Sequence, residues 1–112
     1  MQTLTVAGDF TVGGHIISNG SPVSATATVG SALVTGDDVA GNVNVTGTAG
    51  QVVEVTVNFV SPYNVSPSVN ITPTNASRAS DDYFVQATTT GFTVKLVDPA
   101  SGDIAFNYQV IE

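Results

Sequence analysis

The amino-acid sequence predicts an all-β protein: a short N-terminal stem over residues 1–21, followed by an antiparallel β-sandwich over residues 22–112. Valine and threonine occur 19 and 15 times among 112 residues, and their β-branched side chains fit a pleated sheet better than a helix. No segment keeps the helical period of about 3.6 residues over three turns. Turn signals recur about every 8 to 12 residues, which is typical of a sandwich.

The stem is predicted from a six-residue repeat. Leu4–Asp9 aligns with Phe10–His15, and residues 16–21 form a weaker third copy. Each copy begins with a large apolar residue and has glycine at its fifth place, which is typical of a three-residue strand followed by a turn. Three such copies bury too little apolar surface to fold alone, so they gain stability by stacking. We expect an intertwined homotrimer; the alternative is a run of edge strands packed on the downstream domain. The expected trimer interface consists of Leu4, Val6, Phe10, Val12 and Ile16.

About seven strands are expected in the head. They cover residues 24–29, 42–46, 51–60, 69–71, 83–89, 92–96 and 104–111. Residues 51–60 are expected to form the longest strand, with alternating Val53, Val55 and Val57 on its inner face. Residues 35–41 are expected to form a loop bracketed by glycines, and residues 47–50 a hairpin connection.

The charge balance excludes several classes of function. Arg78 and Lys95 are the only cationic residues, against nine acidic ones, which gives a net charge of −7. Nucleic-acid binding and polybasic membrane contact both need many Lys and Arg side chains, so neither is expected. No apolar run approaches the ~20 residues of a membrane-spanning helix. The absence of cysteine excludes disulfides and thiolate metal sites.

The most promising polar segment for binding is the loop over residues 74–82. It brings together an arginine, an amide and two carboxylates, and an aromatic ring follows it; a second ring could come from the proline-flanked loop near residue 63. Sugar recognition uses planar polar groups beside an aromatic face. The candidate receptor-binding residues are Tyr63, Asn75, Arg78, Asp81, Asp82 and Tyr83. The alternative is that Arg78 pairs with Asp81, with Asp82 or with a neighbouring subunit and only fixes the loop.

Metal binding and catalysis have weaker signals. A trimer would bring three copies of His15 together if the side chain faced the axis, but its turn position favours solvent. The acidic pairs at residues 37–38 and 81–82 match no EF-hand spacing, and aspartate is a common turn residue. Nothing in the spacing requires that Glu54 and a loop aspartate form a glycosidase pair. We therefore expect no metal, no cofactor and no enzymatic activity.

The hexads Leu-Thr-Val-x-Gly-Asp and Phe-Thr-Val-Gly-Gly-His resemble the shaft repeats of trimeric bacteriophage tail fibres and tailspikes. Residues 35–45 look like the opening of C-terminal domains of phage and bacterial surface proteins, and residues 91–94 and 106–112 look like the closing strands of those domains. The resemblance implies a homotrimeric fibre tip, on a virion or outside the cell, that attaches to a surface glycan or protein of a bacterial host. The alternative is a purely structural subunit of a virion, a surface layer or an adhesin, without receptor binding.

Overall fold

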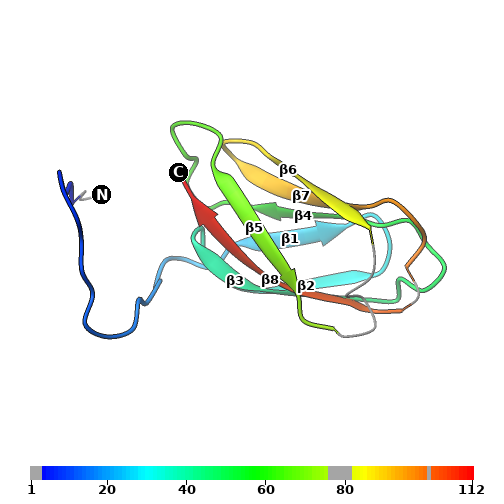
Figure 1. Ribbon diagram of the computed structural model, residues 1–112. Coiled ribbons are helices and arrows are strands. Elements are labelled where there is room, and N and C mark those ends of the chain that lie inside the picture. Colours follow the sequence, from blue (N-terminus) through cyan, green and yellow to red (C-terminus); the bar gives the residue numbers. More distant parts are fainter. Residues whose placement is uncertain (1–3, 76–81, 101) are drawn as a thin grey trace.

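The computed structural model describes residues 4–75, 82–100 and 102–112. The described residues form eight strands in two antiparallel sheets (Figure 1). The strands are β1 (Ser24–Ala27), β2 (Ser31–Gly36), β3 (Ala40–Thr46), β4 (Glu54–Asn58), β5 (Ser68–Pro73), β6 (Tyr83–Ala87), β7 (Gly91–Leu96) and β8 (Ile104–Ile111). The first sheet has the order β1-β4-β7-β6 and the second the order β2-β3-β8-β5. The predicted all-β, sandwich-like class is thereby confirmed, whereas the trimeric stem stays a prediction.

The core lies between the two sheets and follows from the alternation of the strands. In β8, Phe106 and Tyr108 are buried and the residues between and beyond them, Asn107 and Gln109, are exposed. The rings of Tyr108 and Phe92, which belong to opposite sheets, have centroids 5.2 Å apart. Full burial of a valine or phenylalanine side chain contributes about 1.5–3 kcal/mol, so this interior supplies most of the stability of the head.

Two expectations about the strands were wrong. β2 was not expected, because Leu33 points outward on an edge strand and is 68% exposed, so the segment does not alternate between apolar and polar residues. The longest strand is β8 and not residues 51–60, of which β4 covers only Glu54–Asn58. Before β4 the chain is bonded to a loop and not to a strand: the backbone carbonyl of Gln51 accepts a hydrogen bond of 2.7 Å from the N–H of Ala100, which lies between β7 and β8.

The predicted hairpin over residues 47–50 is instead a crossing between sheets. It leads from β3 in the second sheet to β4 in the first. Gly47 and Gly50 have φ angles of 77° and 78°, which glycine adopts without strain. Between them, the fully buried Thr48 donates a hydrogen bond from its hydroxyl to the backbone carbonyl of Gly102. This contact fixes the crossing to the loop before β8.

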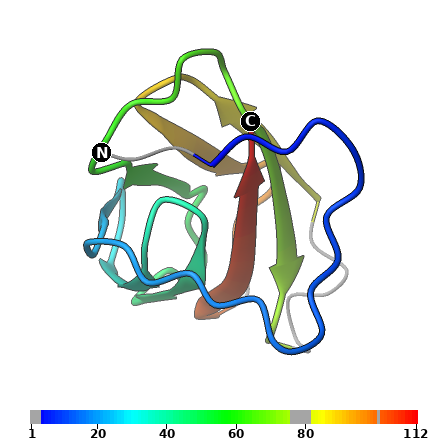
Figure 2. The same cartoon turned by 90° about the vertical axis from the view of Figure 1, so that its left-hand side faces the viewer.

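Residues 4–20 form an extended arm without any strand of its own. The arm leaves the sandwich at the end where β8 finishes (Figure 1), and in Figure 2, which faces that end, it lies outside both sheets. Every residue from 4 to 20 is exposed. The three-residue strands expected for the repeat are therefore not formed within one chain, and their formation between chains stays a prediction.

Candidate functional site

The residues predicted to bind a receptor are divided between two ends of the head. Tyr83 is the first residue of β6, whereas the backbone N–H of Tyr63 donates to the carbonyl of Thr89, beyond the last residue of β6, at 2.8 Å. The two tyrosines therefore do not form one aromatic platform within a chain. Arg78 and Asp81 lie outside the described residues.

Tyr63 is hydrogen-bonded to the turn that contains Asp37 and Asp38. Its hydroxyl donates a hydrogen bond of 2.6 Å to the backbone carbonyl of Asp38, and its ring packs edge-on against Phe59 with centroids 5.0 Å apart. Burial raises the pKa of Tyr63, and the negative charges of Asp38, Asp37 and Glu112 raise it further. The phenol thus stays protonated and serves as a donor inside the molecule.

Asn75, Asp82 and Tyr83 lie near one another at the opposite end of β6. The side-chain amide of Asn75 donates to the backbone carbonyl of Asp103 at 3.1 Å. Tyr83 is half-buried, and its side chain and Pro73 line the same small apolar slot between the sheets. Asp82 is exposed, and its carbonyl accepts a hydrogen bond from the N–H of Val97 at 3.0 Å. These contacts place each residue separately against neighbouring backbone or core, and the receptor-binding role of the three residues stays a prediction.

The arm presents an unusually apolar surface to solvent. Leu4 is 79% exposed, Phe10 is 67% exposed and Ile16 is 86% exposed, and Val6 and Val12 are exposed as well. Ile17 is also highly exposed. The repeat pattern did not identify it, because it takes the second place of its hexad. Burying a large apolar side chain is favourable by about 1.5–3 kcal/mol, so the exposure of these side chains on the arm is energetically unfavourable.

The carboxylate of Asp37 anchors the arm to the head. Its oxygens accept hydrogen bonds from the Ser18 hydroxyl at 2.5 Å and from the Gly20 backbone N–H at 2.8 Å. The same carboxylate accepts from the N–H groups of Val39 and Ala40, at 2.9 and 3.1 Å, inside the turn between β2 and β3. One side chain therefore closes a hairpin and holds the arm to it. The sequence carried a partial signal for this role, since an aspartate between two glycines is typical of a turn.

The hydrogen bonds of Asp37 outweigh the cost of its burial. The side chain is only 4% exposed, and burial alone would raise its pKa. The hydrogen bonds from Ser18, Gly20, Val39 and Ala40 stabilise the charged form and lower the pKa from 3.8 to about 2. Asp37 is therefore ionised over the whole physiological pH range.

The described residues offer no cluster for a metal. No group of three or more His, Asp or Glu side chains in residues 4–75, 82–100 and 102–112 is arranged to hold an ion. Both carboxylates of the first acidic pair are already used: Asp38 accepts hydrogen bonds from the backbone N–H groups of Val60 and Ser61, at 2.7 and 3.0 Å. His15 lies exposed on the arm.

No protein-family model, no curated protein and no solved structure matches the chain. In the part of the chain that the structure describes, no helix has the length and apolar character needed to cross a membrane.

Proposed function

We propose that the chain is the non-enzymatic tip domain of a trimeric attachment fibre of the phage tail-fibre or tailspike type. In this proposal the arms of three chains intertwine as a stem, and the three sandwich heads contact a glycan or protein on a bacterial surface. The observation that carries it is the exposure of Leu4, Phe10 and Ile16 on an arm that makes no packing contact of its own with the head core. Such a segment gains stability by burying its apolar face against copies of itself.

The anchoring of the arm supports the same proposal. Asp37 holds Ser18 and Gly20 against the turn between β2 and β3, so the stem would meet each head at a fixed point. Three heads held in a fixed geometry bind a repetitive surface with avidity, because the first contact raises the local concentration of the other sites. The surplus of acidic residues gives no attraction to anionic envelopes, so selective contacts are needed for attachment.

The assembly is tested by measuring molar mass with light scattering at micromolar concentration. The full chain is expected at three times the monomer mass of 11.4 kDa, and a variant lacking residues 1–16 is expected at the monomer mass. That deletion keeps Ser18 and Gly20, so the contacts of Asp37 remain intact. A full chain that is monomeric at this concentration would overturn the proposal.

A pair of point variants controls for nonspecific effects of charge. Phe10→Asp places a carboxylate on the apolar side of the repeat and is expected to dissociate the trimer. Thr11→Asp introduces the same charge at the adjacent exposed position and is expected to leave the trimer intact. Equal dissociation by both variants would contradict the assignment of Phe10 to the interface.

A purely structural subunit is the second candidate function. It is favoured by the use of the candidate receptor groups within the chain, since the Tyr63 hydroxyl and the Asn75 amide already donate to backbone carbonyls. Adsorption of the labelled trimer to intact bacterial cells separates the two functions. Saturable adsorption supports attachment, and its absence across a broad panel of strains supports the structural subunit.

A further inference from the structure

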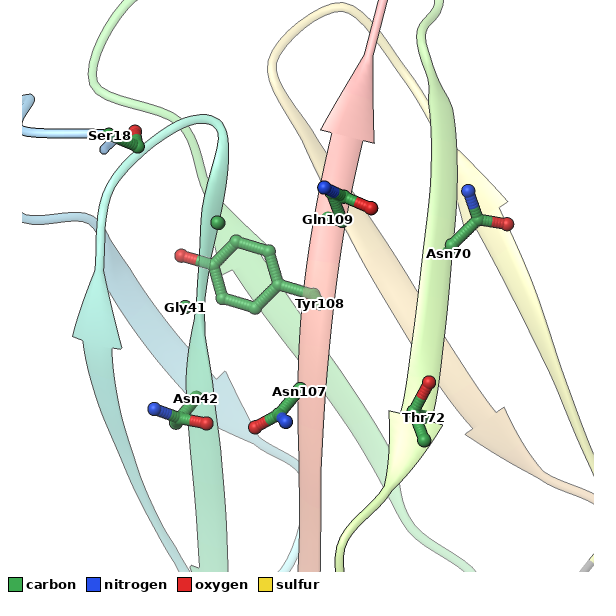
Figure 3. A pocket seen from close by; sticks show the side chains of 9 residues that line it. Ser18, Gly41, Asn42, Asn70, Thr72, Asn107, Tyr108 and Gln109 are labelled. Atoms are coloured by element: carbon green, nitrogen blue, oxygen red, sulfur yellow. The ribbon is translucent and has the colours of Figure 1, made fainter. Parts of the chain in front are cut away.

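The outer face of the second sheet contains an open hollow of about 500 Å³ that is lined by uncharged polar side chains (Figure 3). It spans three neighbouring strands, β3, β8 and β5, and the arm reaches its rim at Ser18. The polar side chains from the three strands are Asn42, Asn70, Thr72, Asn107 and Gln109. This surface is distinct from the loops to which the sequence assigned receptor binding.

The strand register arranges these side chains as a regular array. Asn42 is paired with Asn107, which is paired in turn with Thr72, so these three form one row across the sheet. Gln109 is paired with Asn70 and forms the next row on the same face. Neighbouring strands lie about 4.8 Å apart and alternate residues about 7 Å apart, so the array measures roughly 10 by 7 Å. A short stretch of a linear glycan has matching dimensions.

The hydrogen-bonding groups of the array are not used within the chain. Across the described residues, none of the five side chains hydrogen-bonds to another protein group, and all five residues are exposed. Each amide offers two donor hydrogens and an acceptor oxygen, and the threonine hydroxyl offers both functions. Figure 3 shows the side chains of Asn42 and Asn107 turned toward each other between adjacent strands, with Gln109 and Asn70 on β8 and β5 beside them.

We propose that this hollow binds a neutral, hydroxyl-rich glycan. The proposal rests on the attachment function above, for which it names the ligand class and the site. Sugar hydroxyls both donate and accept, as the amides do, so the two sets of groups are complementary. No charged residue lines the hollow, and the net charge of −7 repels a polyanionic glycan. An acidic polysaccharide is therefore a poor ligand.

A protein partner fits this surface less well than a glycan. Protein interfaces depend on a few large aromatic or apolar anchors that enter pockets. The one aromatic residue lining the hollow, Tyr108, is only 3% exposed and packs into the core. Hydrogen bonds at an exposed surface replace hydrogen bonds to water and contribute little net free energy each, so a single hollow binds weakly and attachment depends on three copies.

The test is an NMR titration of the isotopically labelled full chain with neutral glucose, galactose and mannose hexasaccharides. Oligogalacturonate serves as the anionic comparison. At least one neutral hexasaccharide is expected to shift the side-chain amide signals of Asn42, Asn70, Asn107 and Gln109. Oligogalacturonate is expected to leave them unchanged.

Two matched amide-to-acid variants then locate the site. Asn107→Asp keeps the shape of the central side chain, removes its donor hydrogens and adds a negative charge; it is expected to weaken binding at least tenfold. Gln86→Glu makes the same change at an exposed position of β6 in the first sheet and is expected to leave the affinity unchanged. Circular dichroism melting of both variants reports whether either change disturbs the fold.

Binding that is insensitive to Asn107→Asp, shifts confined to residues near Tyr63 or Tyr83, or no binding by any neutral hexasaccharide would each overturn the inference. The proposed function is judged separately, from molar mass and cell adsorption. A trimer that adsorbs to cells regardless of Asn107→Asp keeps the function and removes this site. A monomer that binds the hexasaccharide in the hollow removes the trimeric function and keeps the site.

Discussion

The Ser18 hydroxyl and the Asp37 carboxylate are joined by a hydrogen bond of 2.5 Å, although the two residues lie 19 positions apart in the sequence. This contact and the neighbouring one from Gly20 connect the exposed arm to a buried side chain of the sandwich. The orientation of the arm relative to the head therefore depends on one carboxylate.

Replacement of Asp37 by asparagine is expected to destabilise the head by about 1–3 kcal/mol. The amide retains one acceptor oxygen but presents donor hydrogens to N–H groups that need an acceptor, which leaves donors unpaired. Urea unfolding measures the change in the free energy of unfolding. Asp98→Asn, at an exposed position, is the matched control and is expected to change it by less than about 0.5 kcal/mol. Equal stability of the two variants would contradict the anchoring role.

Stability is expected to fall in acid because of the same group. The pKa of Asp37 is lowered in the folded state, from 3.8 to about 2, so its contribution is complete above about pH 5 and is lost as the pH falls towards 2. The contribution is about 2 kcal/mol. Urea unfolding of the wild type and Asp37→Asn at pH 5 and pH 2 measures it. The gap between the two proteins should narrow at pH 2, where about half of the wild-type Asp37 side chains are protonated; a constant gap would refute the assignment.

Gly41→Ala is expected to destabilise the head by about 1–3 kcal/mol or more, because the site has no room for a methyl group. A Cβ there would lie 2.6 Å from the carbonyl oxygen of Thr35 and 2.6 Å from the Tyr108 hydroxyl. At Gly102 an added Cβ meets no described atom within 4 Å, so Gly102→Ala is the control. Thermal melting followed by circular dichroism should show a clear drop for Gly41→Ala alone.

The ion pair between Lys95 and Glu54 is expected to contribute less than about 1 kcal/mol. The two charged groups are 3.2 Å apart, but their side chains are 30% and 45% exposed, so water and salt screen the attraction. The Lys95 ammonium also lies 5.9 Å from the centre of the Phe84 ring. A double-mutant cycle with Lys95→Ala and Glu54→Gln measures the coupling energy of the pair. A coupling energy above about 2 kcal/mol would contradict this expectation.

The sequence predicted best those strands whose apolar residues alternate. β8 was predicted over residues 104–111 and observed there, because Ile104, Phe106 and Tyr108 alternate with side chains of the outer face. β2 was missed because the exposed Leu33 interrupts the alternation of apolar and polar residues along the strand. The alternation of apolar and polar residues therefore predicts which side chains are buried, and it predicts a strand only indirectly.

Contacts between distant segments limited the remaining predictions. The glycines at residues 47 and 50 indicated a turn, but no local signal distinguishes a hairpin from a crossing between sheets. The alternation of polar and apolar residues along β8 is visible in the sequence. The array in the hollow also requires β3 and β5 to flank β8, which is a property of the topology. For the same reason the sequence indicated a turn at Asp37 but not the hydrogen bonds by which this residue anchors the arm.

The position of the anchor determines how a mechanical load would enter the molecule. A pull on residues 4–17 first reaches Ser18 and Gly20, which are hydrogen-bonded to Asp37 in the turn between two strands of the second sheet, β2 and β3. Only then does it continue along the backbone to β1 in the first sheet. The backbone carbonyl of Asp37 also accepts a hydrogen bond from Tyr108, which lies in the interior strand β8. Tension is thus shared between both layers and transmitted to a central strand, so that no single edge strand is peeled away on its own.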